Sequence, residues 1–279
     1  MMAAGSDIRK SETVLKKGQI LASREIGVLA AIGLTEVTVY KRPKVAVLST
    51  GAEVVEPGEP LPPGKIYDIN AHTLSAAVLE AGGEPINLGI IPDKKDRLKK
   101  ALENALDSAD AVITSGGVSV GPKDFTPQVV DSLGKPGVII SGVAVKPGKP
   151  TTIAVIDGKP VFSLPGHPTS SLFMFNVFVR PILVKLAGRT EETLPTLKAV
   201  AAQKMFPARG RRTFVMVNLT YDKSGTMLVS PVPTGLSGAI TTLAKADGFV
   251  EISEKQQFID AGTEIDVILF GKLRKTETA

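Results

Sequence analysis

Apolar, strand-like runs alternate with segments of helical periodicity between residues 44 and 133, and this alternation constrains the fold more than any other feature. The strand-like runs are KVAVLST (44–50), EPINLGII (84–91) and DAVIT (110–114). The helical segments are Asn70 to Ala81, a second that begins at Asp93, and Phe125 to Leu133. Strands and helices that alternate at this spacing are typical of βαβ units. The sequence therefore predicts an α/β fold with a mostly parallel sheet.

The chain on either side of this region has a different character. The first 42 residues contain a helical segment, SREIGVLAAIGL, and end in a strand-like run, EVTVYKR, before Pro43. The apolar helix SSLFMFNVFVRPILVKLAG follows Pro168 and is expected to pack on the sheet. From residue 190 the apolar segments are short, β-like and separated by turn residues. We predict an N-terminal segment at 1–42, an α/β domain at 43–189 and a small all-β domain at 190–279.

Composition argues against several classes of partner and chemistry. The 279 residues carry a formal net charge of +5, but basic residues are mixed with acidic ones and are not interleaved with aromatic residues. We therefore expect no nucleic-acid partner. No uninterrupted apolar stretch reaches the roughly 20 residues of a membrane span, and the N-terminus lacks a secretory pattern, so no membrane is expected either. The lack of cysteine excludes disulfides and thiolate metal sites, and we expect a cytoplasmic protein.

Polar clusters follow three predicted strands at the point where each strand ends. They are Ser49-Thr50-Gly51-Ala52-Glu53 after the first strand, Asp93 after the second, and Ser115 to Asp124 after the third. Ligands of open α/β sheets bind at the carboxyl ends of the strands, so these residues are candidates for one site. The turn SGGVSVG (115–121) is either an anion cradle of backbone N–H groups or a tight turn that needs positive φ. It matches neither the P-loop nor the G-x-G-x-x-G dinucleotide fingerprint.

Charged residues at the strand ends indicate the chemistry of a ligand. The turn KPGKP (146–150) brings Lys146 and Lys149 together. If their ammonium groups lie about 5 to 6 Å apart, their repulsion costs about 3 kcal/mol at an effective dielectric of about 20, unless the two groups share an anion. The alternative is that the two side chains point apart and are solvated. Glu53, Asp93 and Asp124 follow three different strands, and convergent carboxylates suit Mg²⁺. The two aspartates also suit helix N-caps.

The histidines give no signal for a metal site. His72 and His167 are the only two, and they lie on different predicted elements with no cysteine nearby, so zinc is not expected. No G-x-S-x-G elbow is present to hold a serine nucleophile. We interpret His167, which precedes Pro168, as structural or ligand-facing rather than as a general base.

Six motifs resemble one enzyme family in their order and spacing. They are VAVLSTGAEV (45–54), GKIYDIN (64–70), NLGIIPD (87–93), DAVITSGGVSVGPKDFT (110–126), VKPGKP (145–150) and LPGHPTSS (164–171). They resemble the molybdopterin molybdenumtransferase family, which is the MoeA type and is related to the E domain of gephyrin. The resemblance implies a MogA-like three-layer α/β domain followed by a small all-β domain. It also implies the insertion of molybdate into adenylylated molybdopterin with release of AMP, a role for Mg²⁺, a homodimer, and contacts with molybdopterin-synthesis partner proteins.

The resemblance assigns roles to individual residues. It implies that Glu53, Asp93 and Asp124 are catalytic and hold the metal ion, and that the catalytic pair Lys146 and Lys149 holds phosphate or molybdate. The positions that resemble the pterin- and phosphate-binding part of the family's site are Thr50, Gly51, Asp68, Ser115, Gly116, Gly117, Ser119, Gly121, Pro165 and Gly166. In the β domain the corresponding residues are Arg211 in GRRTF and Ser237 in GLSGAI, near molybdate. Asp7, in GSDI, resembles an acid supplied across the dimer interface.

Two other functions share several of these features. A MogA-type molybdopterin adenylyltransferase has the same turn and α/β domain, whereas the extra β domain and the KPGKP turn favour the molybdotransferase. A non-catalytic molybdopterin-binding or scaffold module is the other alternative. Family members carry a long N-terminal region, so residues 1–42 are expected to be a remnant of that domain. His167 and Thr169 stand where many relatives have Asn and an aliphatic residue. The choice between molybdate and tungstate stays open.

Overall fold

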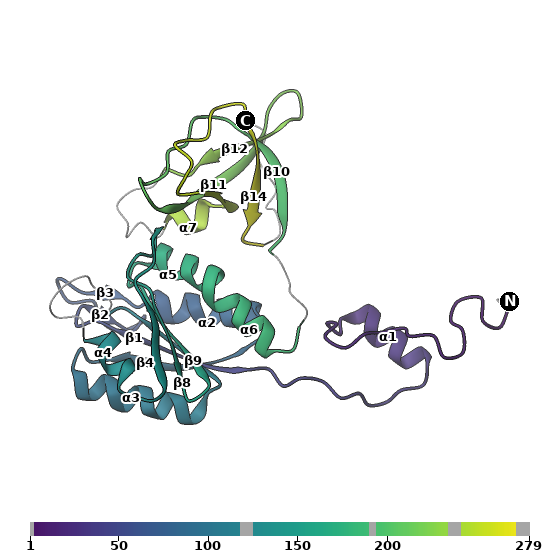
Figure 1. Ribbon diagram of the computed structural model, residues 1–279, viewed down its shortest axis with the longest axis horizontal. Helices are drawn as coiled ribbons and strands as arrows, with labels where there is room; N and C mark the ends of the chain where they lie inside the picture. Colours follow the sequence, from purple (N-terminus) through teal and green to yellow (C-terminus); the bar gives the residue numbers. More distant parts are fainter. Residues whose placement is uncertain (1–2, 118–124, 190–193, 234–240, 272–279) are drawn as a thin grey trace.

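The computed structural model describes residues 3–117, 125–189, 194–233 and 241–271, and two large sheets dominate it (Figure 1). The first sheet has the strand order β4-β1-β5-β9-β8-β6. Its strands are β1 (Lys44–Thr50), β4 (Glu84–Ile91), β5 (Ala111–Ser115), β6 (Pro136–Ser141), β8 (Thr152–Ile156) and β9 (Lys159–Leu164). Strands β4, β1, β5 and β9 are parallel, whereas β8 is antiparallel to both of its neighbours. The predicted mostly parallel sheet is confirmed.

Helices cover both faces of this sheet, which is the middle of three layers (Figure 1). One face carries α2 (Asn70–Glu80) and the continuous helical stretch α5 (Pro168–Met174), η1 (Phe175–Val179) and α6 (Arg180–Leu186). The other face carries α3 (Lys95–Ser108) and α4 (Thr126–Asp131). Because both faces are covered, every residue of β1 after Lys44 is buried. This burial confirms the prediction made from its apolar run.

The start of α3 differs from the sequence prediction. The helix begins at Lys95, so the N-cap position falls on Lys94, whose backbone is extended at φ −132° and ψ 130°. No side chain accepts a capping hydrogen bond there. The prediction that Asp93 caps this helix is therefore wrong, and capping does not account for an acid at this strand end.

The N-terminal segment lies to one side of both sheets (Figure 1). Its helix, α1 (Ser23–Ala31), has no buried residue. The prediction that residues 36–42 form a strand is wrong. No neighbouring strand pairs with them, and Val39 and Tyr40 are 62% and 51% exposed. A strand requires a partner for its backbone hydrogen bonds, and the described residues offer none here.

The second sheet closes into a small barrel. Its strands are β10 (Thr196–Ala201), β11 (Arg212–Tyr221), β12 (Met227–Pro231), β13 (Gly248–Ile252) and β14 (Glu264–Leu269), with β7 (Val145–Lys146) at one edge. The order is β12-β10-β14-β13-β11-β7, and an additional pairing between β12 and β11 closes the ring. The predicted small β domain is confirmed, and a short helix, α7 (Thr241–Lys245), adds to it.

An aromatic cluster joins the α/β part to the barrel. The ring centroid of Phe173, in α5, lies 5.1 Å from that of Phe249, 5.6 Å from Phe270 and 5.9 Å from Phe214. The stretch Pro168–Leu186 is long and apolar enough to cross a membrane by length and composition. Its buried residues, Phe173 among them, instead pack in the hydrophobic core that the sheet, α2 and the barrel share. Here the stretch is a core helix.

We expect Phe173→Leu to lower the free energy of unfolding by about 1 to 2 kcal/mol, because the change removes three ring contacts while it keeps most of the apolar volume. Denaturation in urea, followed by circular dichroism, measures the effect. Phe206→Leu is the matched control, because Phe206 is 68% exposed and its one aromatic ring contact among the described residues is with Phe258. Equal losses for the two variants would contradict an aromatic junction.

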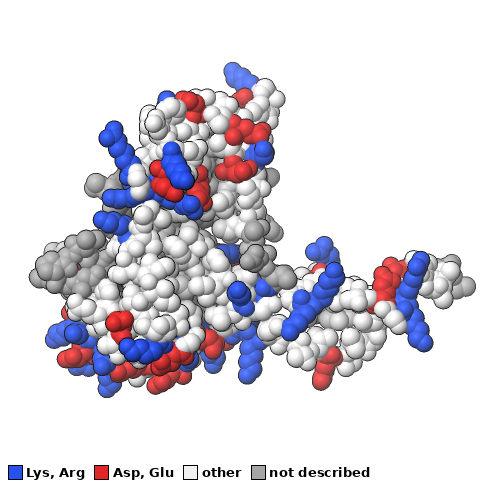
Figure 2. Space-filling view, in the orientation of Figure 1, with Lys and Arg blue, Asp and Glu red and all other residues white. Residues whose placement is uncertain are grey.

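Charges of both signs lie side by side along one edge of the molecule. Figure 2 shows Lys and Arg side chains beside Asp and Glu side chains along the edge formed by α3. This matches the mixture of basic and acidic residues in the sequence of that helix. A mixed edge of this kind does not present the continuous basic surface that attracts nucleic acids.

Candidate functional site

A cavity of about 600 Å³ lies at the carboxyl ends of three neighbouring parallel strands. Ser49 and Thr50 end β1, Ser115 ends β5, and Gly166 follows β9. The strand register places Ser49 opposite Ser115, and Ser115 opposite Leu164. Three motifs that are far apart in the sequence therefore meet at one edge of the sheet, where open α/β sheets bind their ligands.

Residues 53–70 form a second wall of the cavity. Two short strands, β2 (Val54–Val55) and β3 (Ile66–Tyr67), pair in parallel within this segment. The segment then enters α2, and Asp68 and Asn70 at this point are 3% and 8% exposed. Both side chains line the cavity. The helix start thus presents two buried polar side chains to the strand ends.

The glycine turn after β5 packs tightly against the end of β1. Gly116 has φ +88°, and a Cβ there would lie 2.2 Å from the carbonyl oxygen of Thr50. Gly117 has φ +65°, and a Cβ there would lie 2.7 Å from Thr50 Oγ1. Thr126 Oγ1 donates to the Gly117 carbonyl at 2.8 Å. The tight-turn interpretation therefore holds for these two glycines, and both also line the cavity.

Buried polar atoms without partners gather at this cavity. Ser49 Oγ, Thr50 Oγ1, Asp68 Oδ2 and Asn70 Oδ1 are buried and have no hydrogen-bond partner in the described part of the chain. All four side chains line the cavity. Buried polar groups in proteins are almost always hydrogen-bonded, so a cluster of exceptions calls for a polar ligand or ordered water. Ser49 belongs to the polar cluster predicted at the end of the first strand, whereas Asn70 is absent from the predicted site residues. The sequence signal that indicates Asn70 is its place as a polar residue at the start of an apolar helix, in Asp68-Ile69-Asn70.

The lysine turn borders the same cavity and is held from two sides. Pro150 lines the cavity, and Gly148, with φ +109°, packs so closely on α5 that a Cβ would lie 2.4 Å from the sulfur of Met174. Strand β7 contains Lys146 and pairs in parallel with β11, so that Lys146 lies opposite Thr213 and Val145 opposite Arg212. Arg211 directly precedes this pair. The ladder therefore brings the predicted lysine and arginine motifs side by side, although 60 residues or more separate them.

Two of the three predicted acids, Glu53 and Asp93, follow strands that end at the same edge of the sheet. Glu53 lines the cavity and is exposed. Thr50 at the end of β1 pairs with Ile91 at the end of β4. Glu53 lies three residues after Thr50, and Asp93 lies two residues after Ile91. Within the described ranges no group of three His, Asp or Glu side chains could hold a metal ion. The third predicted ligand, Asp124, lies outside those ranges, as do Ser119, Gly121 and Ser237. The magnesium site stays a prediction.

Two family models match the chain. Residues 46–185 match a model described as the probable molybdopterin binding domain, and this match alone covers half of the chain. Residues 198–270 match the MoeA C-terminal region, domain IV. The chain belongs to the MoeA family. The first matched region contains the whole cavity at the strand ends, and the second contains the barrel that pairs with the lysine turn.

Named relatives of the MoeA family agree with this membership. The chain is 35% identical over 270 residues to a molybdopterin molybdenumtransferase of Haemophilus influenzae, covering 96% of this chain and 66% of the relative. It is 34% identical over 266 residues to one of Bacillus subtilis, covering 95% and 61%. A molybdopterin biosynthesis MoeA protein of Pyrococcus horikoshii superposes with a TM-score of 0.83 and 43% identity, covering 96% of this chain and 64% of that one. The chain thus spans slightly less than two thirds of these relatives.

One residue that the resemblance implied is not brought to the cavity within this MoeA-family chain. Asp7 is exposed and belongs to the N-terminal segment, which Figure 1 shows away from the strand ends. Its contribution across a dimer interface stays a prediction.

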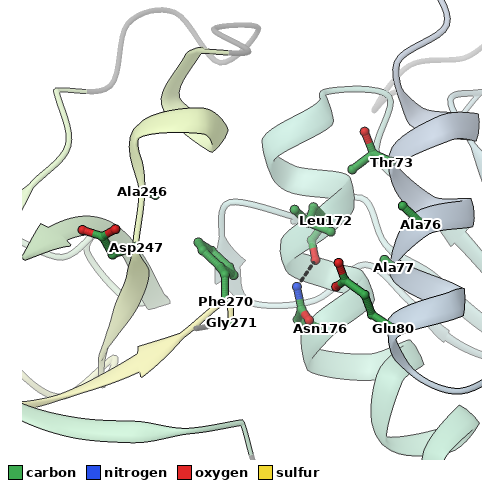
Figure 3. Close-up of a pocket in the computed structure, with 10 residues that line it drawn as sticks. All are labelled: Thr73, Ala76, Ala77, Glu80, Leu172, Asn176, Ala246, Asp247, Phe270 and Gly271. Carbon is green, nitrogen blue, oxygen red and sulfur yellow. Dashed lines mark hydrogen bonds between the residues drawn. The ribbon is translucent and has the colours of Figure 1, made fainter. Parts of the chain in front are cut away.

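A second cavity, of about 300 Å³, lies between α2, the α5–η1 stretch and the barrel (Figure 3). Asp247 and Phe270 come from the barrel side, and Glu80 from α2. Asn176 Nδ2 donates to the Leu172 carbonyl, at 3.0 Å. Asp247 Oδ2 accepts from Leu219 N–H at 2.8 Å. No predicted site residue lines this cavity, and none of its lining side chains is among the buried polar groups without a partner, so the strand-end cavity is the better candidate for the MoeA site.

Proposed function

We propose that this chain acts in molybdenum cofactor biosynthesis as a molybdopterin molybdotransferase, which inserts molybdate into adenylylated molybdopterin and releases AMP. The observation that carries the proposal is the strand-end cavity. It combines four unpartnered buried polar atoms with the glycine turn, and it lies inside the region that matches the probable molybdopterin binding domain. The curated relatives that bear this activity in their names support the same conclusion.

The arrangement of charges supports specific roles for the predicted residues. Lys146, Lys149 and Arg211 lie around one β7–β11 ladder, and we assign to them the binding of molybdate and phosphate anions. Positive groups fixed in advance near phosphorus stabilise the charge that develops there. An oxygen of water or of molybdate forms a bond to the AMP phosphorus while the phosphoanhydride bond breaks and the molybdopterin phosphate leaves. Where molybdate is the nucleophile, water then cleaves the bond between molybdate and AMP, and AMP is released.

Glu53, Asp93 and Asp124 complete the proposal as the residues that would hold Mg²⁺. Carboxylate oxygens are the ligands that Mg²⁺ prefers, and adjacent strands place the first two at one edge. When bound, the ion would neutralise charge on the phosphates. We include in the same proposal a homodimer, a cytoplasmic location, and the division of the chain at residues 42/43 and 189/190.

The MogA-type adenylyltransferase is the weaker candidate. Its reaction needs only the α/β part, whereas this chain continues into a barrel that matches the MoeA C-terminal region. The pairing of β7 with β11 ties the lysine turn directly to that barrel. A second domain that takes part in the site fits the molybdotransferase better.

We expect the purified chain to release AMP from adenylylated molybdopterin when molybdate is added, and to release little without it. AMP is quantified by chromatography, and the product is tested by reconstitution of a cofactor-free molybdenum enzyme. A parallel reaction with molybdopterin and ATP tests the alternative. Transfer of AMP to molybdopterin in that reaction would replace the proposal with the adenylyltransferase. Binding of molybdopterin without either reaction would favour the scaffold module.

A further inference from the structure

A third cavity, of about 530 Å³, lies where the N-terminal segment meets the α/β domain. Its walls are residues 15–21, Leu29 and residues 37–42 of the N-terminal segment, together with Gly82 and residues 187–189 of the α/β domain. None of these residues lines the strand-end cavity. Its volume falls in the range of about 300 to 1,000 Å³ that is typical of small-molecule sites.

The charged side chains that line this cavity are all basic. They are Lys16, Lys17, Lys41, Arg42 and Arg189, and we call the site the basic cavity. Among the described residues, no Asp or Glu lines it. Figure 2 shows several Lys and Arg side chains where the N-terminal segment joins the α/β domain. The mixture of signs along α3 is therefore not repeated at this place.

The basic side chains of the N-terminal segment lack acidic partners. Lys16, Lys17, Lys41 and Arg42 make no ion pair with any described residue. The nearest approach to a compensating group is that of Lys17, whose Nζ lies 5.7 Å from the centroid of the Tyr40 ring. Two Lys and Arg pairs that are 24 residues or more apart in the sequence thus meet at one cavity without an acid between them.

Helix ends account for the fifth basic residue only. Arg189 follows the C-terminus of α6 by three residues, and a Cβ on Gly82, just after α2, would lie 2.4 Å from its guanidinium group. The C-terminal end of a helix carries partial negative charge and attracts cations. This explains Arg189, but the other four belong to the N-terminal segment and need a different explanation.

The walls of the basic cavity are held together by close packing. Gly188 has φ +68°, and a Cβ there would lie 2.3 Å from the Tyr40 ring, so the ring lies directly against the end of α6. The backbone N–H groups of residues 37–42 donate to no described residue. Basic side chains and unpaired backbone N–H groups are the donors that proteins use for phosphate.

We propose that the basic cavity binds the phosphate chain of a small molecule with two or more phosphate groups, either free pyrophosphate or a nucleotide. Several cations without acidic partners match a ligand with several negative charges, whereas a single carboxylate or a neutral ligand would leave most of them uncompensated. Arg42 can contact two oxygens of one phosphate, and the lysines act as point charges. This site lies outside the proposed reaction, which takes place at the strand-end cavity.

The test is calorimetric titration of the full chain with pyrophosphate. Lys149→Ala is the background for every variant, because the strand-end cavity is itself proposed to bind phosphate. Lys41→Gln/Arg42→Gln removes two cations from the basic cavity. Lys99→Gln/Lys100→Gln is the matched control, because it removes two adjacent, exposed cations from α3 and gives the same net charge. Lys41→Arg/Arg42→Lys keeps both charges.

We expect Lys41→Gln/Arg42→Gln to weaken pyrophosphate binding at least about tenfold, the combined effect of two exposed ion pairs of up to about fivefold each. The control on α3 and the charge-preserving variant should change binding less than about twofold. Added salt should weaken binding to the background chain, because it screens exposed charges. ADP and adenosine identify the source of the phosphates. ADP that binds more tightly than pyrophosphate assigns a nucleotide, and ADP that binds equally or less tightly assigns pyrophosphate, whereas adenosine should not bind.

Four results would overturn the basic cavity as a phosphate site. They are an absence of pyrophosphate binding to the background chain, unchanged binding in Lys41→Gln/Arg42→Gln, equal weakening in that variant and the control on α3, and adenosine that binds as tightly as ADP. Because the titrations use neither molybdopterin nor molybdate, they are independent of the proposed function. An unmodified chain that releases no AMP would reject that function and leave the basic cavity standing.

Discussion

Lys149→Ala should reduce kcat/KM for molybdate-dependent AMP release by about 100-fold or more, the typical effect of removing one fixed charge-stabilising donor. The lysine belongs to a turn that cannot move freely. Gly148 packs on Met174, and β7 is paired to β11. The backbone that carries the Lys149 side chain is thus held in place before charge develops on phosphate or molybdate. The measurement is steady-state AMP release at several molybdate concentrations.

Three comparisons separate the charge of Lys149 from its shape. Lys149→Arg keeps a positive group and should keep more activity than Lys149→Met, which keeps only the length of the side chain. Activity of the unmodified chain should fall as ionic strength rises, because salt screens the anion. Lys100→Ala, on the exposed side of α3, is the control and should be unchanged. Equal activity in the Arg and Met variants would show that the charge of Lys149 is not what the reaction uses.

The sheet could be predicted from the sequence because its strands are local patterns. Each central strand is an apolar run, and each is followed by a helix with a clear period, so type and order follow from short windows of sequence. The same reasoning predicted the helix at Asn70, and α2 begins at that residue. It failed where structure depends on a distant partner. Residues 36–42 read as a strand but have no strand beside them among the described residues, and the start of α3 depends on the extended backbone at Lys94.

The candidate site could be predicted only in part for a related reason. Strand ends are known once the strands are known, and Thr50, Ser115 and Gly166 do meet at one cavity. The pairing of β7 with β11 involves two residues in each strand, and no sequence window is long enough to predict it. Asn70 could not be predicted because its role depends on contacts between distant parts of the chain. Its amide nitrogen donates hydrogen bonds to Ser115 and Gly166, and only these bonds leave its amide oxygen without a partner.

Gly116→Ala should lower the free energy of unfolding by about 2 to 5 kcal/mol. About 1 to 2 kcal/mol comes from the left-handed backbone, and about 1 to 3 from overpacking. The overpacking arises because the new Cβ would lie 2.2 Å from the Thr50 carbonyl oxygen. That oxygen is backbone at the end of β1 and cannot rotate away. The turn and the strand end must separate, which moves both walls of the cavity, and a shift of about 1 Å at a site costs about 100-fold in rate.

Gly225→Ala separates the two parts of this effect. Gly225 has φ +84°, close to the +88° of Gly116, but a Cβ there has no atom within 4 Å. It lies in the turn between β11 and β12, away from the cavity. We expect this variant to lose only about 1 to 2 kcal/mol of its free energy of unfolding, because of the left-handed backbone, and to keep its activity. Urea denaturation and AMP release are measured on both variants. If the two lose equal stability, the contact between Gly116 and Thr50 is not tight, and the glycine turn would have to be explained by its conformation and its ligand alone.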